Sequence, residues 1–315
     1  MPKTLLITGA STGFGRDMAE ALAKAGHRVF ASMRDPSGKN RERANALWSQ
    51  GIDVVALDVT NDDSVSRAIQ VVLGKAAKID VLINNAGIAS VGITEAFTPA
   101  QFQVVLDTNV VGLLRTVRAV LPGMRRAGEG LVINVGSTMG RVTYPFFGLY
   151  GASKFAVEAF TDCLRCEVSS FGVDVVLVQP GGSYPTSIRT NTQMPADKDC
   201  EIAYGVLAGL PGDILRFLSS SIRGEGAPSL RDVTVAVAKL IDTPAGARPA
   251  RSIVGHSNGA DEVNEAVEPV QRRLMEHLGL GYLARIGGRS APPATWPPDP
   301  GAPSLGRLRF DDGAQ

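Results

Sequence analysis

A tyrosine and a lysine four residues apart are the first pair in this chain that could do chemistry. Tyr150 and Lys154 fall on one face of a predicted helix, one turn apart. A free phenol keeps its proton at neutral pH, because its pKa is about 10. A neighbouring ammonium favours the phenolate, so we expect Lys154 to bring the pKa of Tyr150 toward the range useful for proton transfer. Such pairs also arise by chance on exposed helices, and the surrounding elements must decide between the two interpretations.

A glycine-rich turn near the N-terminus predicts nucleotide binding. The apolar run 3–7 leads into TGASTGFG at residues 8–15, and a helical pattern with Met18 and Leu22 follows. Strand, glycine turn and helix form the first half of a nucleotide-binding unit, in which glycines let the backbone approach a pyrophosphate at the free N–H groups of the helix. The spacing G-x3-G-x-G departs from the general fingerprint, and a plain tight turn is the alternative.

The residues after the second predicted strand, 28–32, bear on the choice of cofactor. An NAD site usually has a carboxylate here that accepts a hydrogen bond from the ribose 2′-hydroxyl. This chain has Met33 and then Arg34, and an arginine can bind a 2′-phosphate through charge-assisted hydrogen bonds. Asp35 could partly neutralise that charge, and a surface arginine in a turn is the alternative. The sequence favours NADP(H) and leaves NAD(H) possible.

Strands alternate with helices along most of the chain, which predicts a parallel, doubly wound α/β sheet. Ser137 directly follows the predicted strand 131–135, at the carboxyl edge where open sheets bind ligands. Asn109 lies in the middle of an apolar helix predicted for about 99–126, where a structural and a catalytic role stay equally open. The other predicted strands are 54–57, 80–83, 173–179 and 251–254, with further helices at about 230–241 and 261–278.

Residues 183–228 interrupt this alternation with prolines, glycines and short helical stretches that have apolar sides. A long irregular segment after a ligand-binding strand predicts a substrate lid, and its apolar content favours a lipophilic or aromatic substrate. The end of the chain is dense in proline, glycine and alanine. We therefore expect a domain over residues 1–285 and an extended or disordered tail over 286–315.

Composition argues against several classes of function. A net charge of +1 in 315 residues argues against a nucleic-acid binder, and no apolar run is long enough to span a membrane. The first predicted strand begins near Lys3, which leaves no room for a signal peptide. Three cysteines are typical of a reducing compartment such as the cytoplasm, and Cys163 and Cys166 lie inside a helix, where we expect structural roles. The scattered histidines suggest no metal site.

Together these features resemble the short-chain dehydrogenase/reductase family over about residues 3–255. The resemblance is greatest to its hydroxysteroid and retinol dehydrogenase-like branch. It implies a single-domain Rossmann-like fold, with about seven parallel strands in the order 3-2-1-4-5-6-7 and helices on both faces. The motifs that carry the resemblance are TGxxxGxG at 8–15, Asp58, NNAG at 84–87, Asn109, Ser137, Tyr150-x3-Lys154, and Pro180-Gly181 with Thr186.

The resemblance also implies a role for each catalytic residue. Tyr150 would act as general acid or base, while Lys154 would lower its pKa and hold the nicotinamide ribose. Ser137 would hydrogen-bond the substrate oxygen where negative charge develops, and Asn109 would hold a water that links Lys154 to solvent. The cofactor-binding residues that it implies are Gly9, Ser11, Thr12, Gly13, Phe14, Gly15, Arg34, Asp58, Val59, Asn85, Ala86, Gly87, Tyr150, Lys154, Pro180, Gly181 and Thr186.

The expected function is an NADP(H)-dependent oxidoreductase that interconverts a carbonyl and an alcohol on a lipophilic or aromatic small molecule. The alternative is a non-catalytic NADP(H)-binding regulatory protein, although such relatives typically lack the tyrosine or the lysine. A sugar-nucleotide epimerase or dehydratase fits poorly, because those relatives usually carry G-x2-G-x2-G. The resemblance favours a homodimer or homotetramer formed through the long apolar helices.

Overall fold

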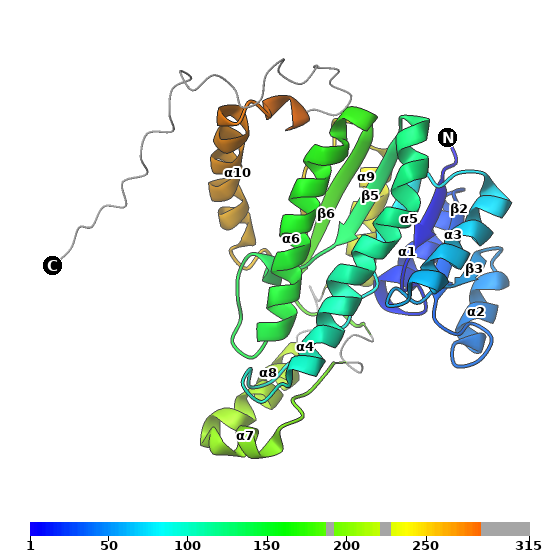
Figure 1. Ribbon diagram of the computed structural model, residues 1–315. Helices are drawn as coiled ribbons and strands as arrows, with labels where there is room; N and C mark the ends of the chain where they lie inside the picture. Colours follow the sequence, from blue (N-terminus) through cyan, green and yellow to red (C-terminus); the bar gives the residue numbers. More distant parts are fainter. Residues whose placement is uncertain (187–191, 221–227, 285–315) are drawn as a thin grey trace.

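One sheet of seven parallel strands lies at the centre of the computed structural model, which describes residues 1–186, 192–220 and 228–284. The strand order is β3-β2-β1-β4-β5-β6-β7, which confirms the predicted order (Figure 1). The strands are β1 (Thr4–Ile7), β2 (Arg28–Met33), β3 (Asp53–Ala56), β4 (Val81–Asn84), β5 (Gly130–Val135), β6 (Val173–Gly181) and β7 (Arg251–Gly255).

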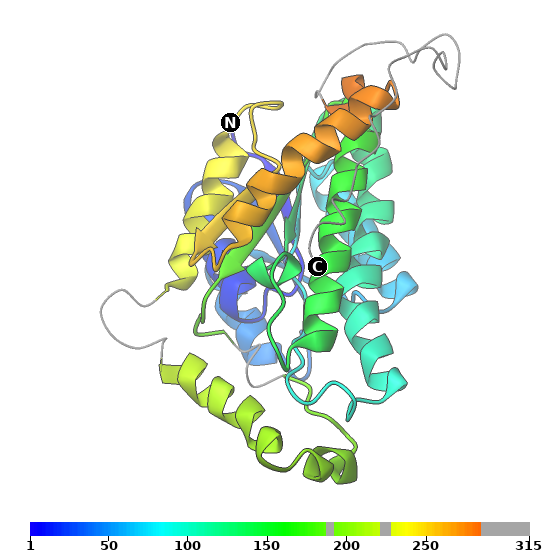
Figure 2. The ribbon, with the colours of Figure 1, turned by 90° about the vertical axis from the view of Figure 1, so that its left-hand side faces the viewer.

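Helices connect these strands and cover both faces of the sheet (Figures 1 and 2). The helices in the described residues are α1 (Gly13–Lys24), α2 (Arg41–Trp48), α3 (Asp62–Ala76), α4 (Pro99–Leu106), α5 (Gly112–Ala127), α6 (Gly148–Val168), α7 (Lys198–Ala203), α8 (Leu210–Ser220), α9 (Leu230–Asp242) and α10 (Ala260–His277). A π-helical turn, η1 (Asp107–Val111), joins α4 to α5, and short 3₁₀ turns are η2 (Thr138–Gly140), η3 (Ser169–Phe171), η4 (Gly205–Gly209) and η5 (Gly281–Ala284).

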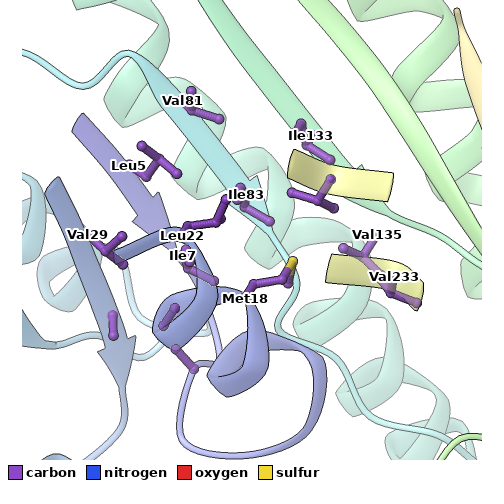
Figure 3. Packing of buried hydrophobic residues seen from close by; sticks show 14 of the residues in the cluster. Leu5, Ile7, Met18, Leu22, Val29, Val81, Ile83, Ile133, Val135 and Val233 are labelled. Atoms are coloured by element: carbon purple, nitrogen blue, oxygen red, sulfur yellow. The ribbon is translucent and has the colours of Figure 1, made fainter. Parts of the chain in front are cut away.

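Two hydrophobic cores, one on each face, hold the strands in place. Leu5 and Ile7 of β1 point to the face covered by α1, α2 and α9, and Figure 3 shows them beside Met18 and Leu22 of α1. Leu6 points to the opposite face, against α3, α5 and α6. Because both faces are covered, the strands read as nearly continuous apolar runs rather than as an apolar–polar alternation. Helix α6, which carries Tyr150 and Lys154, is therefore packed on the sheet along its buried side.

The helix starts follow from local side-chain hydrogen bonds. Asn61 caps α3 by accepting a hydrogen bond from Ser64 N at 2.7 Å, and Asp62 opens the first turn, where a negative charge suits the helix dipole. Thr98 caps α4 in a reciprocal capping box with Gln101, and Pro99 occupies the first helical position. These caps fix the ends of the helices that face the carboxyl edge of the sheet.

Three elements differ from the sequence prediction. The helix predicted over 99–126 is interrupted by η1, which encloses Asn109. Helix α2 was not predicted, because its eight residues carry only two buried apolar side chains. The segment 183–228 contains an eleven-residue helix, α8, in addition to short stretches. Residues 187–191 and 221–227 of the predicted lid, and the tail 286–315, lie outside the described residues.

Candidate active site

The glycine turn and the NNAG segment form one hydrogen-bonded unit at the carboxyl edge of the sheet. The Thr8 hydroxyl accepts hydrogen bonds from Asn85 N at 2.9 Å and from Ala86 N at 3.0 Å. The Asn85 amide donates in return to the carbonyl oxygens of Thr8 and Gly9. A Cβ on Gly15 would lie 2.5 Å from Gly9 O, so a larger residue could not pack here. The chain thus uses glycine where two backbone segments approach closely.

The N-terminus of α1 fits an anionic group. Its N-cap, Thr12, makes no side-chain capping hydrogen bond in the described structure, and the first turn carries no acidic residue. The first backbone N–H groups of α1 therefore point outward with the positive end of the helix dipole. Thr186 lies against Gly13, whose added Cβ would come within 3.3 Å of it, and Phe14 packs edge-on against Tyr184. These residues fit a nucleotide pyrophosphate beside the turn.

Arg34 and Asp35 follow β2, and their side chains differ in what they contact. Arg34 is exposed. The Asp35 carboxylate accepts hydrogen bonds from Gly38 N at 3.0 Å and from Lys39 N at 2.7 Å, and its backbone has a positive φ of 45°. The Asp35 carboxylate is thus bound to the backbone of its own turn. In the described structure no hydrogen bond joins it to the Arg34 side chain. After the next strand in the sequence, β3, Asp58 accepts hydrogen bonds from the amide and hydroxyl of Thr60.

Ser137, Tyr150 and Lys154 come together where β5 ends against α6. Ser137 caps η2 by accepting a hydrogen bond from Met139 N at 3.1 Å, and it also forms a hydrogen bond with the Tyr150 phenol. The Lys154 ammonium lies 5.6 Å from the centre of the Tyr150 ring and donates to the carbonyl of Val135 at 2.9 Å. The spacing of four residues on α6 therefore places the phenol and the ammonium on one side of the helix, as predicted.

The electrostatics of this pair correct one expectation from the sequence. Burial raises the pKa of Tyr150 to about 12, and the hydrogen bond with Ser137 only partly opposes this rise. Burial also lowers the pKa of Lys154 to about 8, against the opposing charge of Glu158. Because the ammonium is bound to the Val135 carbonyl rather than to the phenol, it does not produce the lowered tyrosine pKa that we expected.

The side-chain amide of Asn109, in η1, has hydrogen-bond partners at both its oxygen and its nitrogen. Its side-chain oxygen accepts from Ile88 N at 2.9 Å, and its nitrogen donates to Ile88 O at 2.9 Å and to the Ser153 hydroxyl at 3.0 Å. The amide therefore ties the π turn both to the segment after β4 and to α6. π turns inside α-helices often occur at functional sites. These side-chain hydrogen bonds support the fold. That Asn109 also holds a water linking Lys154 to solvent stays a prediction.

A small hollow brings several predicted residues together. Val59, Ala86, Asn109 and Lys154 line it, with Thr8 and Val135. Arg34 stands at the end of β2, outside this lining, and Gly181 stands at the end of β6, where an added Cβ would meet Thr138 and His256. A second, open hollow between α1 and α9 is lined by none of the predicted residues. The predicted site thus spans the carboxyl ends of β1 to β6.

Two positioning residues were missed in the sequence. Thr8 holds the NNAG segment through its hydroxyl, and Ser153 holds Asn109. Thr8 had a signal, since a hydroxyl directly after a strand and before the first glycine of the turn is placed to bind a neighbouring backbone. Ser153 had none, because its partner is 44 residues away in the sequence.

Other sites find little support in the described parts of the chain. Within residues 1–186, 192–220 and 228–284, no group of three or more His, Cys, Asp or Glu residues could hold a metal ion. Over the same residues, none of the helices combines the length and the apolar content needed to cross a membrane. The thiols of Cys163, Cys166 and Cys200 are all free.

Comparison with known protein families shows which family this chain belongs to. The family described as short chain dehydrogenase matches residues 3–197, which is more than half of the chain. The chain belongs to the short-chain dehydrogenase family. The match covers β1 to β6, and with them the glycine turn, the NNAG segment, Asn109, Ser137, Tyr150 and Lys154.

Similar family members act on different molecules, to judge from their names. The chain is 40% identical over 183 residues to 3-ketodihydrosphingosine reductase of Bacteroides thetaiotaomicron, which covers 57% of this chain and 64% of that protein. It is 40% identical over 185 residues to human retinol dehydrogenase 8, which covers 57% of this chain and 58% of that protein. The chain therefore spans about three fifths of the length of these curated relatives.

Solved structures share nearly the whole fold. A short-chain dehydrogenase from Streptomyces avermitilis superposes with a TM-score of 0.70 at 29% identity, covering 88% of this chain and 96% of that one. A family member from Burkholderia phymatum in complex with NAD has a TM-score of 0.69 at 25% identity, covering 86% and 95%. A serine dehydrogenase complexed with NADP⁺ has a TM-score of 0.65 at 26% identity, covering 79% and 93%. Both nicotinamide cofactors thus occur on this fold.

Proposed function

We propose that this short-chain dehydrogenase is an NADP(H)-dependent oxidoreductase that interconverts a carbonyl and an alcohol on a lipophilic or aromatic small molecule. The observation that carries the proposal is the hydrogen bond between Ser137 and the Tyr150 phenol, with the Lys154 ammonium 5.6 Å from the phenol ring. A proton donor, an oxyanion-stabilising hydroxyl and a cation at one point are the groups that carbonyl reduction needs.

Each residue has a distinct task in this proposal. A bound nicotinamide supplies the hydride when it is present. Tyr150 holds its proton throughout the neutral range, because burial raises its pKa, and can donate it to a carbonyl oxygen. Ser137 hydrogen-bonds the same oxygen and stabilises the negative charge that develops there. Lys154 keeps a positive charge beside the phenol below its pKa of about 8, and Asn109 holds η1 in place against α6.

The cofactor preference rests on the residues after β2. Arg34 is an exposed guanidinium at the position where an NAD site usually has a carboxylate, and the nearby carboxylate of Asp35 is occupied by two backbone amides. Arginine suits a 2′-phosphate through its planar, bidentate geometry. This arrangement supports NADP(H) over NAD(H).

The lipophilic substrate class rests on the segment after β6. Gln193 bridges to Ser90 of the segment after β4, and Gln101 donates to Met194 O at 2.8 Å, so residues 193–194 lie beside that segment. Helices α7 and α8 follow them beyond the carboxyl edge of the sheet (Figures 1 and 2). Apolar side chains of this segment are exposed to solvent, which suits a surface that admits apolar molecules: Met194, Ile202, Val206, Leu207, Leu210 and Phe217.

We also propose a homodimer or homotetramer formed through the helices α4 and α5. Val104, Val111 and Leu114 are large apolar side chains that remain exposed along α4, η1 and α5. Exposed apolar surface on a helix pair is favourable to bury against a second copy. Free thiols at all three cysteines agree with a reducing compartment, for which we propose the cytoplasm.

Replacement of Tyr150 by phenylalanine tests the proposed function. Tyr150→Phe removes the proton donor and leaves the ring, so we expect kcat on an accepted carbonyl to fall by about 100-fold or more. The measurement is NADPH oxidation at 340 nm over a panel of steroids, retinoids, aryl ketones and acyl compounds. Tyr282→Phe, in η5, is the matched control and should leave kcat unchanged.

Two results would contradict this assignment. Unchanged turnover by Tyr150→Phe would remove Tyr150 from the reaction. Tight NADPH binding by the unmodified protein, with no turnover on any compound of the panel, would instead favour the alternative of a non-catalytic regulatory protein.

A further inference from the structure

A buried cluster of charged side chains lies directly behind the catalytic helix. Glu158 is one turn beyond Lys154 on α6 and is only 3% exposed. Its Oε2 atom accepts a hydrogen bond from Arg251 Nε at 2.9 Å and lies 3.2 Å from Arg141 Nε. Its Oε1 atom accepts a hydrogen bond from Gln179 Nε2 at 2.5 Å. The tasks of Tyr150, Ser137 and Asn109 in the proposed reaction use none of these groups.

The partners of Glu158 come from three different parts of the fold. Gln179 is on β6 and Arg251 is on β7, while Arg141 follows η2, the turn that begins at Ser137. The turn itself lies directly on the helix, because a Cβ on Gly140 would come within 2.9 Å of Lys154 O and 3.0 Å of Glu158 Cγ. The turn that begins at Ser137 thus contacts α6 at Glu158.

Stability alone does not account well for a carboxylate at this place. A buried ion pair contributes little net stability, because removing both charges from water costs about as much as their attraction returns. Burial in fact raises the pKa of Glu158, and its two arginines and Gln179 oppose that rise. The Arg141 nitrogens Nε and Nη2 make no hydrogen bond in the described structure, so its attraction to Glu158 is one of charge. A need for negative charge at this point of the fold accounts better for the buried carboxylate of Glu158.

The group that needs this charge is the neighbouring ammonium. Lys154 is 7% exposed, and the charged group that acts on it is Glu158 of α6. The neutral Tyr150 ring of the same helix has its centre 5.6 Å from the ammonium, and β5 contributes the neutral carbonyl of Val135. Burial favours the neutral amine, and the charge of Glu158 is the cause that opposes it. An anion one turn away therefore keeps the ammonium charged in a place where burial disfavours it.

We propose that Glu158 is a positioning residue of the reaction, whose carboxylate, bound by Arg251 and Gln179 and beside Arg141, holds the Ser137 turn against α6 and supplies a negative charge one turn along α6 from Lys154. This inference rests on the proposed oxidoreductase function for its effect on turnover, but its effect on Lys154 is independent of that function. Asp162, one turn further along α6, shares Arg251 with Glu158 and lies 3.8 Å from Arg141 Nη2. It is the matched control, because it belongs to the same charge cluster but stands one turn further from Lys154.

The first test measures the titration of Lys154 in the full chain. Competitive labelling of amines with acetic anhydride across a pH series, read by mass spectrometry, gives the midpoint at which Lys154 loses its proton. Glu158→Gln should lower this midpoint by about half a pH unit or more, since it removes this negative charge. Asp162→Asn should leave the midpoint in place. Equal midpoints in Glu158→Gln and the unmodified protein would overturn the inference.

The second test measures turnover of the variants with NADPH. Glu158→Gln should lower kcat about tenfold while the KM for NADPH stays within about twofold, because the Ser137 turn shifts but the nucleotide site does not. If Glu158→Gln does not fold, Glu158→Asp replaces it: its charge is kept but its reach is shorter, so the Lys154 midpoint should hold and kcat should fall. An unchanged kcat in the folded variant, or the same loss in Asp162→Asn, would overturn the positioning role. Absence of turnover in the unmodified protein would count against the proposed function alone.

Discussion

At the residue scale, the phenol of Tyr150 and the amine of Lys154 are tuned in opposite directions by the same cause. Burial disfavours the charged form of each group, so the pKa of the phenol rises to about 12 and that of the amine falls to about 8. At neutral pH the phenol is therefore protonated and the lysine is mostly charged. That is the pair of states required for donating a proton to a carbonyl oxygen.

Arg34 carries the prediction on cofactor choice. Arg34→Ala should raise the KM for NADPH tenfold or more, which corresponds to ~1.4 kcal/mol of lost binding, because a bidentate contact to the 2′-phosphate is removed. The KM for NADH should stay the same. Arg28→Ala is the control, since Arg28 is an exposed arginine at the other end of the same strand. Equal use of NADH and NADPH by the unmodified protein would count against Arg34 as the selecting residue.

At the element scale, the π turn η1 shows why Asn109 matters to the fold. Asn109→Ala would leave the partly buried N–H and C=O groups of Ile88 without their side-chain partner. The Ser153 hydroxyl would lose a donor but would still donate to Tyr150 O. We expect the free energy of unfolding to fall by about 3 kcal/mol. Urea denaturation followed by circular dichroism measures this loss. Thr108 is half-buried in the same turn, and its hydroxyl makes a solvent-exposed hydrogen bond to Val104 O, so Thr108→Ala should cost no more than about 0.5 kcal/mol. Similar losses in both variants would contradict the argument.

The strands, the main helices and the motif residues at the strand ends were predictable from the sequence. Apolar runs such as Leu5 to Ile7 and Leu131 to Val135 announce strands covered on both faces. The π turn was not predictable, because the apolar pattern of residues 99–126 continues unbroken through it and the cause lies in the partners of Asn109, 21 and 44 residues away. Helix α8 was obscured by prolines and glycines around it.

The direction of the Tyr150 pKa was wrong for a related reason. Spacing places Lys154 one turn from Tyr150, but it does not reveal where the ammonium points. The ammonium donates to the Val135 carbonyl, a contact that depends on how α6 packs on β5. The cluster at Glu158 had a partial signal, since Glu158 follows Lys154 by four residues and must share its side of the helix. Its arginine partners, which come from other elements, had none.

At the scale of the whole molecule, the sheet and the segment after β6 differ in how they are held. The strands are fixed between two continuous cores. The segment with α7 and α8 is joined to the body by hydrogen bonds such as that from Tyr204 Oη to Glu95 at 2.6 Å, and Val206 and Phe217 are 93% and 70% exposed. The proposed catalytic groups thus lie on the firmly packed part of the molecule, and the proposed substrate surface lies on the loosely packed part.

The free energy of unfolding, measured as a function of pH, should show how much the buried charge of Lys154 destabilises the folded protein. Folding lowers the pKa of Lys154 from its ordinary value of 10.5 to about 8, so below pH 8 the folded state carries a buried charge that the unfolded state exposes to water. This cost is about 3 kcal/mol below pH 8 and disappears as the pH rises toward 10.5, because the unfolded chain then loses the same proton. Stability attributable to this residue therefore rises with pH between these values.

Lys154→Met tests this sign directly. At pH 7 the variant should be more stable than the unmodified protein by about 2 kcal/mol, since the buried charge is removed and only the hydrogen bond to Val135 is lost. The difference should shrink steadily between pH 8 and 10.5 in urea denaturation, while Lys39→Met, an exposed lysine, should show no such trend. A difference that does not change with pH would mean that Lys154 titrates normally in the folded protein. The gain at pH 7 would come with loss of turnover, which is the compromise expected where a catalytic site buries a charge for its chemistry.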